Sequence, residues 1–268
     1  MKFTKVLSTV AVCAFSALAL SSCSKEENVQ VKDKVSEEAM GQIRALGFTA
    51  TGAQKVDGGY LVEGDILLTE ADLNSTPDHQ ILRVADVEQY RTNNLVSVGS
   101  GRTINVAISS SLPSSYVTAL DEAIRRYNAE NLLIRFRRVS SSYNILLTPA
   151  PSGSSYLASA GFPSGGNPFN SIKVNSAYLG SNPGTNYLAT ILAHEIGHCI
   201  GFRHTDYMDR SYSCGGAYTN EGASTVGAVH IPGTPTTAEP NSWMLACVGS
   251  GVNRPFDAYD RTALNYLY

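Results

Sequence analysis

The amino-acid sequence predicts an α/β (α+β) protein, built on a twisted mixed β-sheet with helices, preceded by a small N-terminal domain. Its 268 residues, 43% of them hydrophobic, can bury a real core in one large domain or in a small domain before a medium one. From Thr103 onward, strand-like and helix-like patterns alternate, and the second half is rich in glycine. Such alternation is typical of α/β and α+β architectures.

Residues 1–22 are expected to be a lipoprotein signal peptide. Lys2 and Lys5 precede a mostly apolar run at 6–20 that is too short to span a membrane comfortably. The next residues, Leu-Ser-Ser-Cys, resemble a bacterial lipobox, which implies cleavage before Cys23 and lipid on its thiol. The alternative is an ordinary signal peptide with an incidental cysteine. We therefore expect an extracytoplasmic lipoprotein of the outer membrane or cell surface, which processing can release.

The next elements belong to a predicted N-terminal domain. Residues 23–35 are polar and fit a tether between lipid and fold. An acidic first turn and a closing glycine predict a helix at 36–47, and residues 60–68 are typical of a strand broken around Gly64. The chain then becomes polar, which sets the limits of this domain at residues 36–100.

Residues 101–268 are expected to form the second domain. The glycine-, serine- and proline-rich stretch 149–170 is expected to be loop. Hydrophobic patterns predict strands at 103–108, 132–138, 143–147 and 171–175, and helices after Pro113, at 185–200 and from Asp257 to the end of the chain.

The sequence His-Glu-Ile-Gly-His at 194–198 falls on the second of these helices. Four helical residues turn through about 400°, so His194 and His198 project from one face and can hold one metal ion. Glu195 lies about 100° further round, near enough to reach a metal-bound water without binding the metal. Alone, this pattern also arises on amphipathic helices whose histidines only face solvent.

Gly201 and His204 make the metal site more specific. Glycine can end the helix in a left-handed conformation, which lets the chain return His204 to the same point. Three neutral imidazoles leave one position of a tetrahedral Zn²⁺ ion open for water, as in catalytic sites. Glu195 can then act as general base and acid while the metal-activated water attacks a peptide carbonyl. The remaining histidines, His79 and His230, are expected on the surface or in loops.

These residues resemble the metzincin clan of zinc peptidases, and the motif with Gly-Phe-Arg-His-Thr-Asp after it is most similar to the bacterial dual-action HEIGH metallopeptidases. The resemblance implies a metzincin-like catalytic domain with an active-site helix and a closing C-terminal helix. It also implies that Met244 forms a tight turn beneath the metal, the alternative being a plain core methionine. Thr205 and Ala246 differ from the astacin pattern, so no tyrosine ligand is expected.

By this resemblance the protein is a zinc-dependent endopeptidase of extracellular proteins, with residues 171–175 as an edge strand that an extended substrate joins. A catalytically silent surface adhesin or binding module on the same fold is the alternative, although the intact Glu195 argues against it. A zinc hydrolase of another amide, such as a peptidoglycan bond, also stays open. With a net charge of −3, we expect no nucleic-acid partner, and we expect a monomer that meets the membrane only through its lipid.

The sequence Glu-Gly-Asp-Ile at 63–66 resembles the aspartate-switch segment of astacin pro-peptides. The resemblance implies that Asp65 occupies the open zinc position and that residues 36–100 form the pro-segment of a latent zymogen. A carboxylate matches the charge of zinc and excludes the attacking water. The alternative is an ordinary turn aspartate after a glycine.

Three cysteines remain once Cys13 leaves with the signal peptide and Cys23 carries lipid, so at most one internal disulfide can form. We expect it between Cys214 and Cys247, because both lie in an irregular stretch that a bridge would order. Cys199 lies on a predicted helix, where a buried thiol is the simpler interpretation.

Overall fold

The computed structural model describes residues 34–74, 89–222, 226–235 and 238–268. The signal peptide at 1–22, the lipidation site Cys23, most of the tether and His79 lie outside these ranges. The described residues belong to one compact unit. None of the helices in the described ranges has both the length and the apolar character that crossing a bilayer requires.

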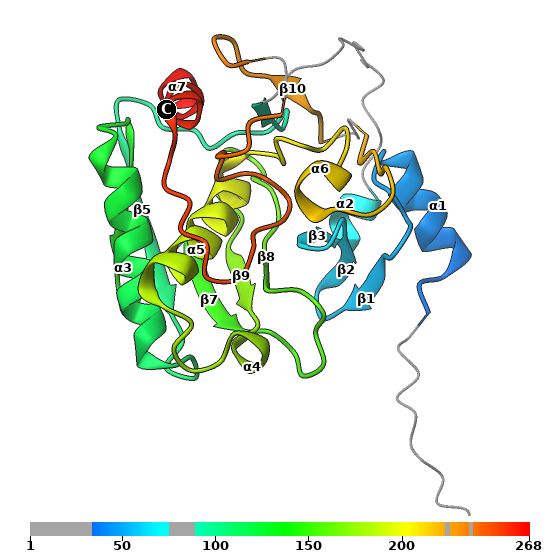
Figure 1. Cartoon of the computed structure of the whole chain (residues 1–268), viewed down its shortest axis with the longest axis horizontal. Helices are drawn as coiled ribbons and strands as arrows, with labels where there is room; N and C mark the ends of the chain where they lie inside the picture. The colour runs from blue at the N-terminus through cyan, green and yellow to red at the C-terminus, as the bar shows by residue number, and fades with distance from the viewer. Residues whose placement is uncertain (1–33, 75–88, 223–225, 236–237) are drawn as a thin grey trace, which may run out of the picture. The chain divides into compact units, whose positions relative to one another are not determined.

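A five-stranded mixed sheet is the framework of the C-terminal part, and its strand order is β6-β5-β7-β9-β8 (Figure 1). Four strands run parallel, and β8 pairs antiparallel with β9. The predicted class and the four predicted strands are thus confirmed. The strands are β5 (Arg102–Ile108), β6 (Ile134–Arg138), β7 (Ile145–Pro149), β8 (Ala158–Ser159) and β9 (Ser171–Val174).

One expectation about this sheet is wrong. Residues 171–175 do not form its edge, because β8 pairs with β9 and covers it. β8 has only two residues and lies within the stretch 149–170 that was expected to be loop, so it has no periodic pattern that the sequence could reveal. The last strand on this side of the sheet is therefore β8.

Two long helices lie side by side on one face of this sheet: α3 (Ser114–Ala129) and α5 (Thr185–Ile200) (Figure 1). Along α3 the apolar side chains face the core at helical spacing, as predicted. Nearly all of α5 is buried, and the hydroxyl of Tyr127 on α3 donates to the carbonyl of Ala193 on α5 at 2.7 Å. The metal-binding helix is therefore held inside the protein.

The last helix, α7 (Ala258–Leu267), begins where the sequence predicts. Asp257 caps it, and Asp260 completes a capping box by accepting from the Asp257 backbone. Asp260 also accepts from the backbone N–H of Trp243 at 3.1 Å and from the side chain of Gln89 at 2.7 Å. One buried carboxylate thus ties three distant segments together.

The N-terminal part has its own core around Ile43, Phe48 and Leu68. The strand predicted at 60–68 is a hairpin of β2 and β3, and its turn contains Glu63, Gly64 and Asp65. Ser36 caps α1, as a helix start at this position requires. The elements are α1 (Glu37–Ala45), β1 (Gln54–Val56), β2 (Gly59–Val62), β3 (Ile66–Thr69) and α2 (Glu70–Leu73), and the three strands form one antiparallel sheet.

Residues 89–98 pack with the C-terminal part, although the sequence places them before the boundary at 100/101. β4 (Tyr90–Arg91) pairs with β10 (Val229–His230), and Val96 belongs to the core of the large sheet. The backbone N–H of Thr92 donates to the carbonyl of Gly201, at the end of α5. This segment therefore supports the C-terminal end of α5.

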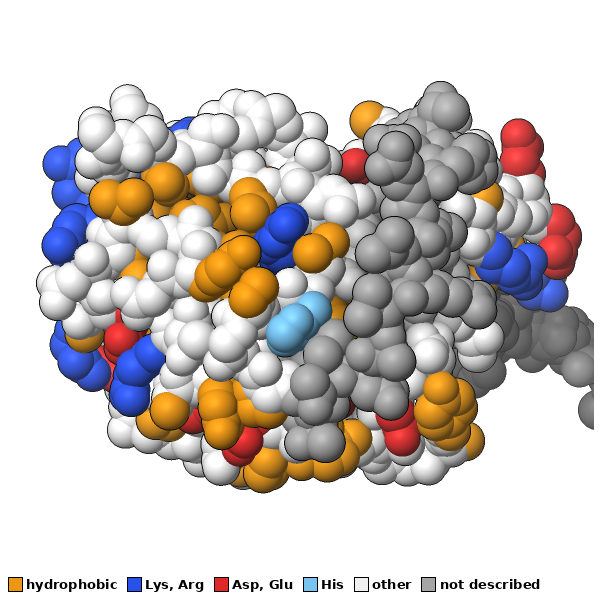
Figure 2. Space-filling view, turned by 90° about the horizontal axis from the view of Figure 1, so that it is seen from above, with side chains coloured by type: hydrophobic (Ala, Val, Ile, Leu, Met, Phe, Trp, Pro, Cys, Tyr) orange, Lys and Arg blue, Asp and Glu red, His pale blue; other side chains and the backbone are white. Residues whose placement is uncertain are grey.

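Two short helices complete the described elements: α4 (Ser176–Leu179) and α6 (Ser211–Cys214). On the face drawn in Figure 2, the described side chains include both basic and acidic groups, and neither sign forms a continuous stretch there. Apolar side chains lie between them. No charged stripe organises the described part of this face.

Candidate metal centre

The end of α5 explains how the third histidine reaches the other two. Gly201 has φ 114° and ψ 10°, a left-handed conformation that glycine adopts without strain. The N–H of Phe202 turns back to the carbonyl of Gly197 at 2.9 Å, which closes the helix. A Cβ on Gly201 would also lie 2.7 Å from Leu95. The left-handed backbone at Gly201 favours glycine, and it directs the following residues back toward the helix.

Three histidines and one aspartate converge at this helix end. The ligand atoms of His194, His198, His204 and Asp65 all lie within 4.8 Å of one another. The Nε2 atoms of His198 and His204 are 3.2 Å apart. The Asp65 carboxylate oxygen Oδ2 lies 3.2 Å from His204 Nε2 and 3.5 Å from His194 Nε2. The structure thus brings all three predicted histidine ligands and Asp65 to one point.

The imidazole rings are oriented as metal ligands. Each Nδ1 lies 2.9 Å from an oxygen of the protein: the Trp243 carbonyl for His194, the Phe202 carbonyl for His198 and a Glu221 carboxylate oxygen for His204. These bonds fix Nδ1 as the donor and leave Nε2 toward the common point. His194 Nε2 is buried and has no hydrogen-bond partner in the part of the chain that the structure describes. Three nitrogen ligands with one oxygen ligand fit Zn²⁺.

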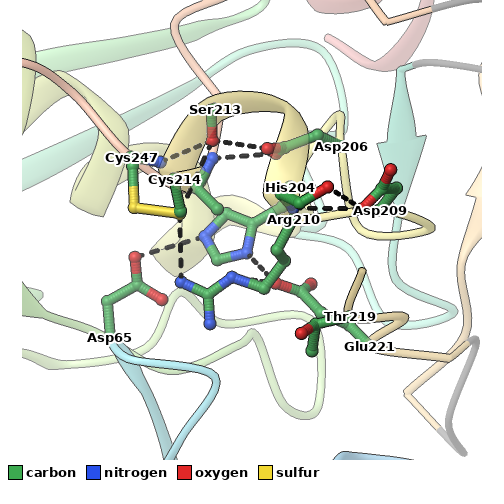
Figure 3. Close-up of a disulfide and its surroundings, with 12 residues drawn as sticks. Asp65, His204, Asp206, Asp209, Arg210, Ser213, Cys214, Thr219, Glu221 and Cys247 are labelled. Atoms are coloured by element: carbon green, nitrogen blue, oxygen red, sulfur yellow. Dashed lines mark hydrogen bonds and ion pairs between the residues drawn. A yellow bond between two sulfur atoms is a disulfide. The ribbon is translucent and has the colours of Figure 1, made fainter. Parts of the chain in front are cut away.

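Glu221 is a functional residue that the sequence did not reveal. Its side chain is buried, accepts from His204 Nδ1 and pairs with Arg210 at 3.1 Å and Arg203 at 3.6 Å. Figure 3 shows Glu221, Arg210, His204 and Asp65 together. Nothing in the local pattern around residue 221 marks it, because its partners lie more than ten residues away. Through its contact with Nδ1, Glu221 orients the ring of His204.

A second buried carboxylate comes from the N-terminal hairpin. Glu63 has φ 54°, an uncommon value for a residue other than glycine. One oxygen accepts from the guanidinium of Arg203 at 3.3 Å, and the other accepts from the N–H of Thr49. Arg203 also lies over the ring of Phe48, at 5.2 Å from its centre. The N-terminal part thus covers the residue just before the third histidine.

Glu195 lies at the same site and borders a cavity of about 250 Å³ together with His194. Glu195 is 2% exposed, and its Oε2 atom has no hydrogen-bond partner among the described residues. A carboxylate in this position has a free oxygen for a proton transfer. No arginine of the described ranges forms an ion pair with it.

Burial and neighbouring charges set the protonation of the site. Burial, with the nearby Asp65 charge, raises the pKa of Glu195 well above its usual value. Burial, with the neighbouring His194 and His204, lowers the pKa of His198 and so favours the neutral ligand form. Burial would also lower the pKa of His204, but Asp65 and Glu221 outweigh it and raise that pKa. Asp65 and Glu221 therefore favour a positive charge at the histidine cluster.

Met244 lies directly against the metal-binding helix and is fully buried. A Cβ built on Gly197 would meet the Met244 sulfur at 2.6 Å, so the glycine inside the helix motif makes room for this methionine. The carbonyl of Met244 accepts from Thr205, and its neighbour Trp243 bonds His194. Met244 and Trp243 therefore lie beside the histidine cluster, and the role of Met244 in a turn beneath a metal stays a prediction.

The structure joins Cys214 of α6 to Cys247, and Cys199 is a buried free thiol. Cys214 follows the third histidine, and Cys247 follows Met244, so the bridge links the two chain segments on either side of the site. Figure 3 places it beside Asp65 and Arg210. His230 lies in β10, paired with β4, away from the histidine cluster.

A family model described as "Dual-action HEIGH metallo-peptidase" matches residues 61–268 of the chain. The matched part begins within β2, so it includes the hairpin residues Glu63 and Asp65 as well as the histidines. No curated protein matches the chain.

Among solved structures, the chain is similar to high choriolytic enzyme 1, a hatching enzyme zinc-protease from the medaka fish Oryzias latipes. The identity is 16%, the TM-score 0.39, and the match covers 64% of this chain and 92% of that one. Two structures of myroilysin also match, both at 15% identity. Their TM-scores are 0.42 and 0.40, with coverage of 63% and 70% of this chain and 81% and 94% of theirs.

Proposed function

Because the chain belongs to the dual-action HEIGH metallopeptidase family, we propose that this metallopeptidase is a zinc-dependent endopeptidase of extracellular proteins, made as a latent zymogen. The observation that carries the proposal is the convergence of His194, His198 and His204 on one point beside Glu195. These three histidines would hold Zn²⁺. When bound, Zn²⁺ supplies Lewis-acid polarisation of the oxygen atoms that it contacts.

The chain's own residues supply the proton transfers. Glu195 takes a proton from water as the water oxygen bonds to the peptide carbonyl carbon, and it returns the proton to the amine nitrogen as the C–N bond breaks. Burial raises the pKa of this carboxyl, which favours the protonated form that donates to the amine. Trp243, Phe202 and Glu221 keep the imidazoles oriented through their Nδ1 atoms.

A metal assay with two variants tests the peptidase proposal. The purified chain is expected to contain one Zn²⁺ per molecule and, after limited proteolysis, to cleave unfolded protein substrates. Glu195→Ala should keep the zinc and lose at least about 10²-fold in activity, whereas Glu130→Ala, at a surface ion pair, should keep both. A zinc-free protein, or cleavage that survives both Glu195→Ala and chelation, contradicts the proposal. The silent adhesin predicts zinc without cleavage.

Latency is supported by where the hairpin lies. Asp65 Oδ2 is within 3.5 Å of two of the histidine nitrogens, where a fourth ligand would sit. The backbone of the hairpin also bonds the catalytic part: Leu67 N–H donates to the Ala160 carbonyl at 2.8 Å, and Ala160 N–H donates to the Asp65 carbonyl at 3.0 Å. The hairpin therefore extends the sheet next to β8, on the edge that a substrate strand would use.

Replacing Asp65 tests the latch. We expect Asp65→Ala to make the uncleaved chain at least about ten-fold more active, because no carboxylate then competes with water at the metal. Asp57 is exposed and lies in the neighbouring β1–β2 turn, so Asp57→Ala is the matched control and should remain latent. Equal activity of the uncleaved parent and Asp65→Ala would remove the latch from the proposal.

We also infer that the protein is a lipoprotein of the outer membrane or cell surface, anchored through Cys23. The support is the sequence alone: a positive start, a short apolar run and the lipobox-like residues before Cys23. In cells fed a labelled fatty acid, the parent should carry label and Cys23→Ser should not. Label in the variant would contradict the anchor.

A further inference from the structure

Most residues that line the cavity beside Glu195 have no role in the proposed reaction. The cavity holds about 250 Å³, enough for one side chain, and His194 and Glu195 form part of its lining. A peptide bond placed at the histidine cluster would therefore put the side chain of an adjacent residue into this cavity. The cavity is positioned to select that residue.

Most of the lining is apolar. The chain segments before β8, along α5 and after Met244 contribute the apolar walls, namely Tyr156, Leu157, Ile191, Trp243, Leu245 and Val248. Such walls remove water from whatever enters, which strengthens any charge interaction inside the cavity.

Arg254 is one of the lining residues, and its guanidinium lies beside Cys247, which also lines the cavity. Its only side-chain hydrogen bond among the described residues goes to the Cys247 carbonyl at 3.2 Å, and it forms no ion pair with any residue that the structure describes. Burial lowers its pKa, as expected for a cation that has lost water without gaining a direct counter-charge. A half-buried arginine with open N–H groups is a binding group for a carboxylate.

The neighbouring carboxylates do not neutralise Arg254 by contact. Asp206 accepts from the N–H of Ala246 and from the Ser213 hydroxyl, and Asp260 is held at the start of α7. The other arginine of the lining, Arg210, is already paired with Glu221. Among the described residues, Arg254 thus has no carboxylate in direct contact, although Asp65 and Glu195 also line the cavity.

We propose that this cavity is a specificity site for an acidic side chain, so that the enzyme cleaves preferentially beside aspartate or glutamate residues of its protein substrates. The proposal rests on the proposed peptidase function and adds the substrate class. Arg254 is then a specificity-determining residue: its guanidinium binds the substrate carboxylate, while the apolar walls hold the methylene groups. Lysine and arginine would be excluded by like charge.

Mapping of cleavage sites tests this. The zinc-loaded chain, activated by limited proteolysis, is incubated with a peptide mixture from a digested proteome, and all cut positions are read by mass spectrometry. We expect acidic residues to be enriched about ten-fold at one of the two positions flanking the cut, which corresponds to about 1.4 kcal/mol. Arg254→Met should abolish the enrichment, Arg254→Lys should retain part of it, and Arg254→Glu should shift it to basic residues.

The matched control is Arg261→Met, which removes an arginine from the surface of α7 and should keep the acidic enrichment. Cleavage without acidic enrichment in the parent overturns the specificity and leaves the peptidase standing. The same enrichment in Arg254→Met also overturns it. Absence of any cleavage by the zinc-loaded, activated chain overturns both, and the Glu195 and zinc measurements identify that case.

Discussion

Replacing Glu221 should weaken zinc binding and the fold together. In Glu221→Gln, His204 Nδ1 loses its charged acceptor, and loss of such an outer partner costs about 10–100-fold in metal affinity. The change also removes a carboxylate 3.1 Å from Arg210 and 3.6 Å from the fully buried Arg203. Removing one partner of a buried ion pair costs about 3–5 kcal/mol. Arg203 keeps Glu63, so we expect the lower end, about 3 kcal/mol.

Two measurements separate these effects. Competition with a chromophoric chelator gives the zinc Kd, and calorimetry in excess zinc gives the Tm, which should fall by roughly 6–12 °C for a unit of this size. Glu130→Gln removes the carboxylate of the ion pair with Arg261 at the C-terminal end of α3 and should change neither quantity. A zinc Kd within two-fold of the parent, with a Tm within 2 °C, would show that Glu221 does not position the ligand.

Two further predictions concern stability. The double variant Cys214→Ser, Cys247→Ser removes a disulfide that spans 33 residues. The free energy of unfolding of the zinc-saturated protein, measured by chemical denaturation, should therefore fall by roughly 3–4 kcal/mol. A decrease below about 1 kcal/mol would contradict this. Burial and Asp257 raise the pKa of Asp260 to about 7, above its unfolded value, so the folded state binds the extra proton and stability falls as pH rises through 7. Between pH 6 and pH 8, deprotonation of this group should lower the free energy of unfolding by about 1.4 kcal/mol. In excess zinc, the stability of Asp260→Asn should depend correspondingly less on pH. If the stability of the variant depends on pH as strongly as that of the parent, the assignment is refuted.

Local pattern was enough to predict much of the fold. The helix at 185–200 has the predicted limits, Asp257 and Asp260 cap α7 as expected, and the four main strands are present. These features depend on residues within one or two turns of each other, so their spacing in the chain carries the information. The two-residue strand β8 has no such spacing, which is why the edge of the sheet was assigned wrongly to residues 171–175.

For the site, the sequence by itself was enough to predict which histidines converge: His194 and His198 share a helix face, and Gly201 reverses the chain toward His204. The rest depended on tertiary structure, because the interacting atoms belong to segments far apart in the chain. Glu221 reaches His204 only after a long loop folds back, Gly197 and Met244 fit only when two segments cross, and Arg254 borders the cavity only after the C-terminal segment packs against α5. Packing, and not periodicity, decides which of these distant groups meet.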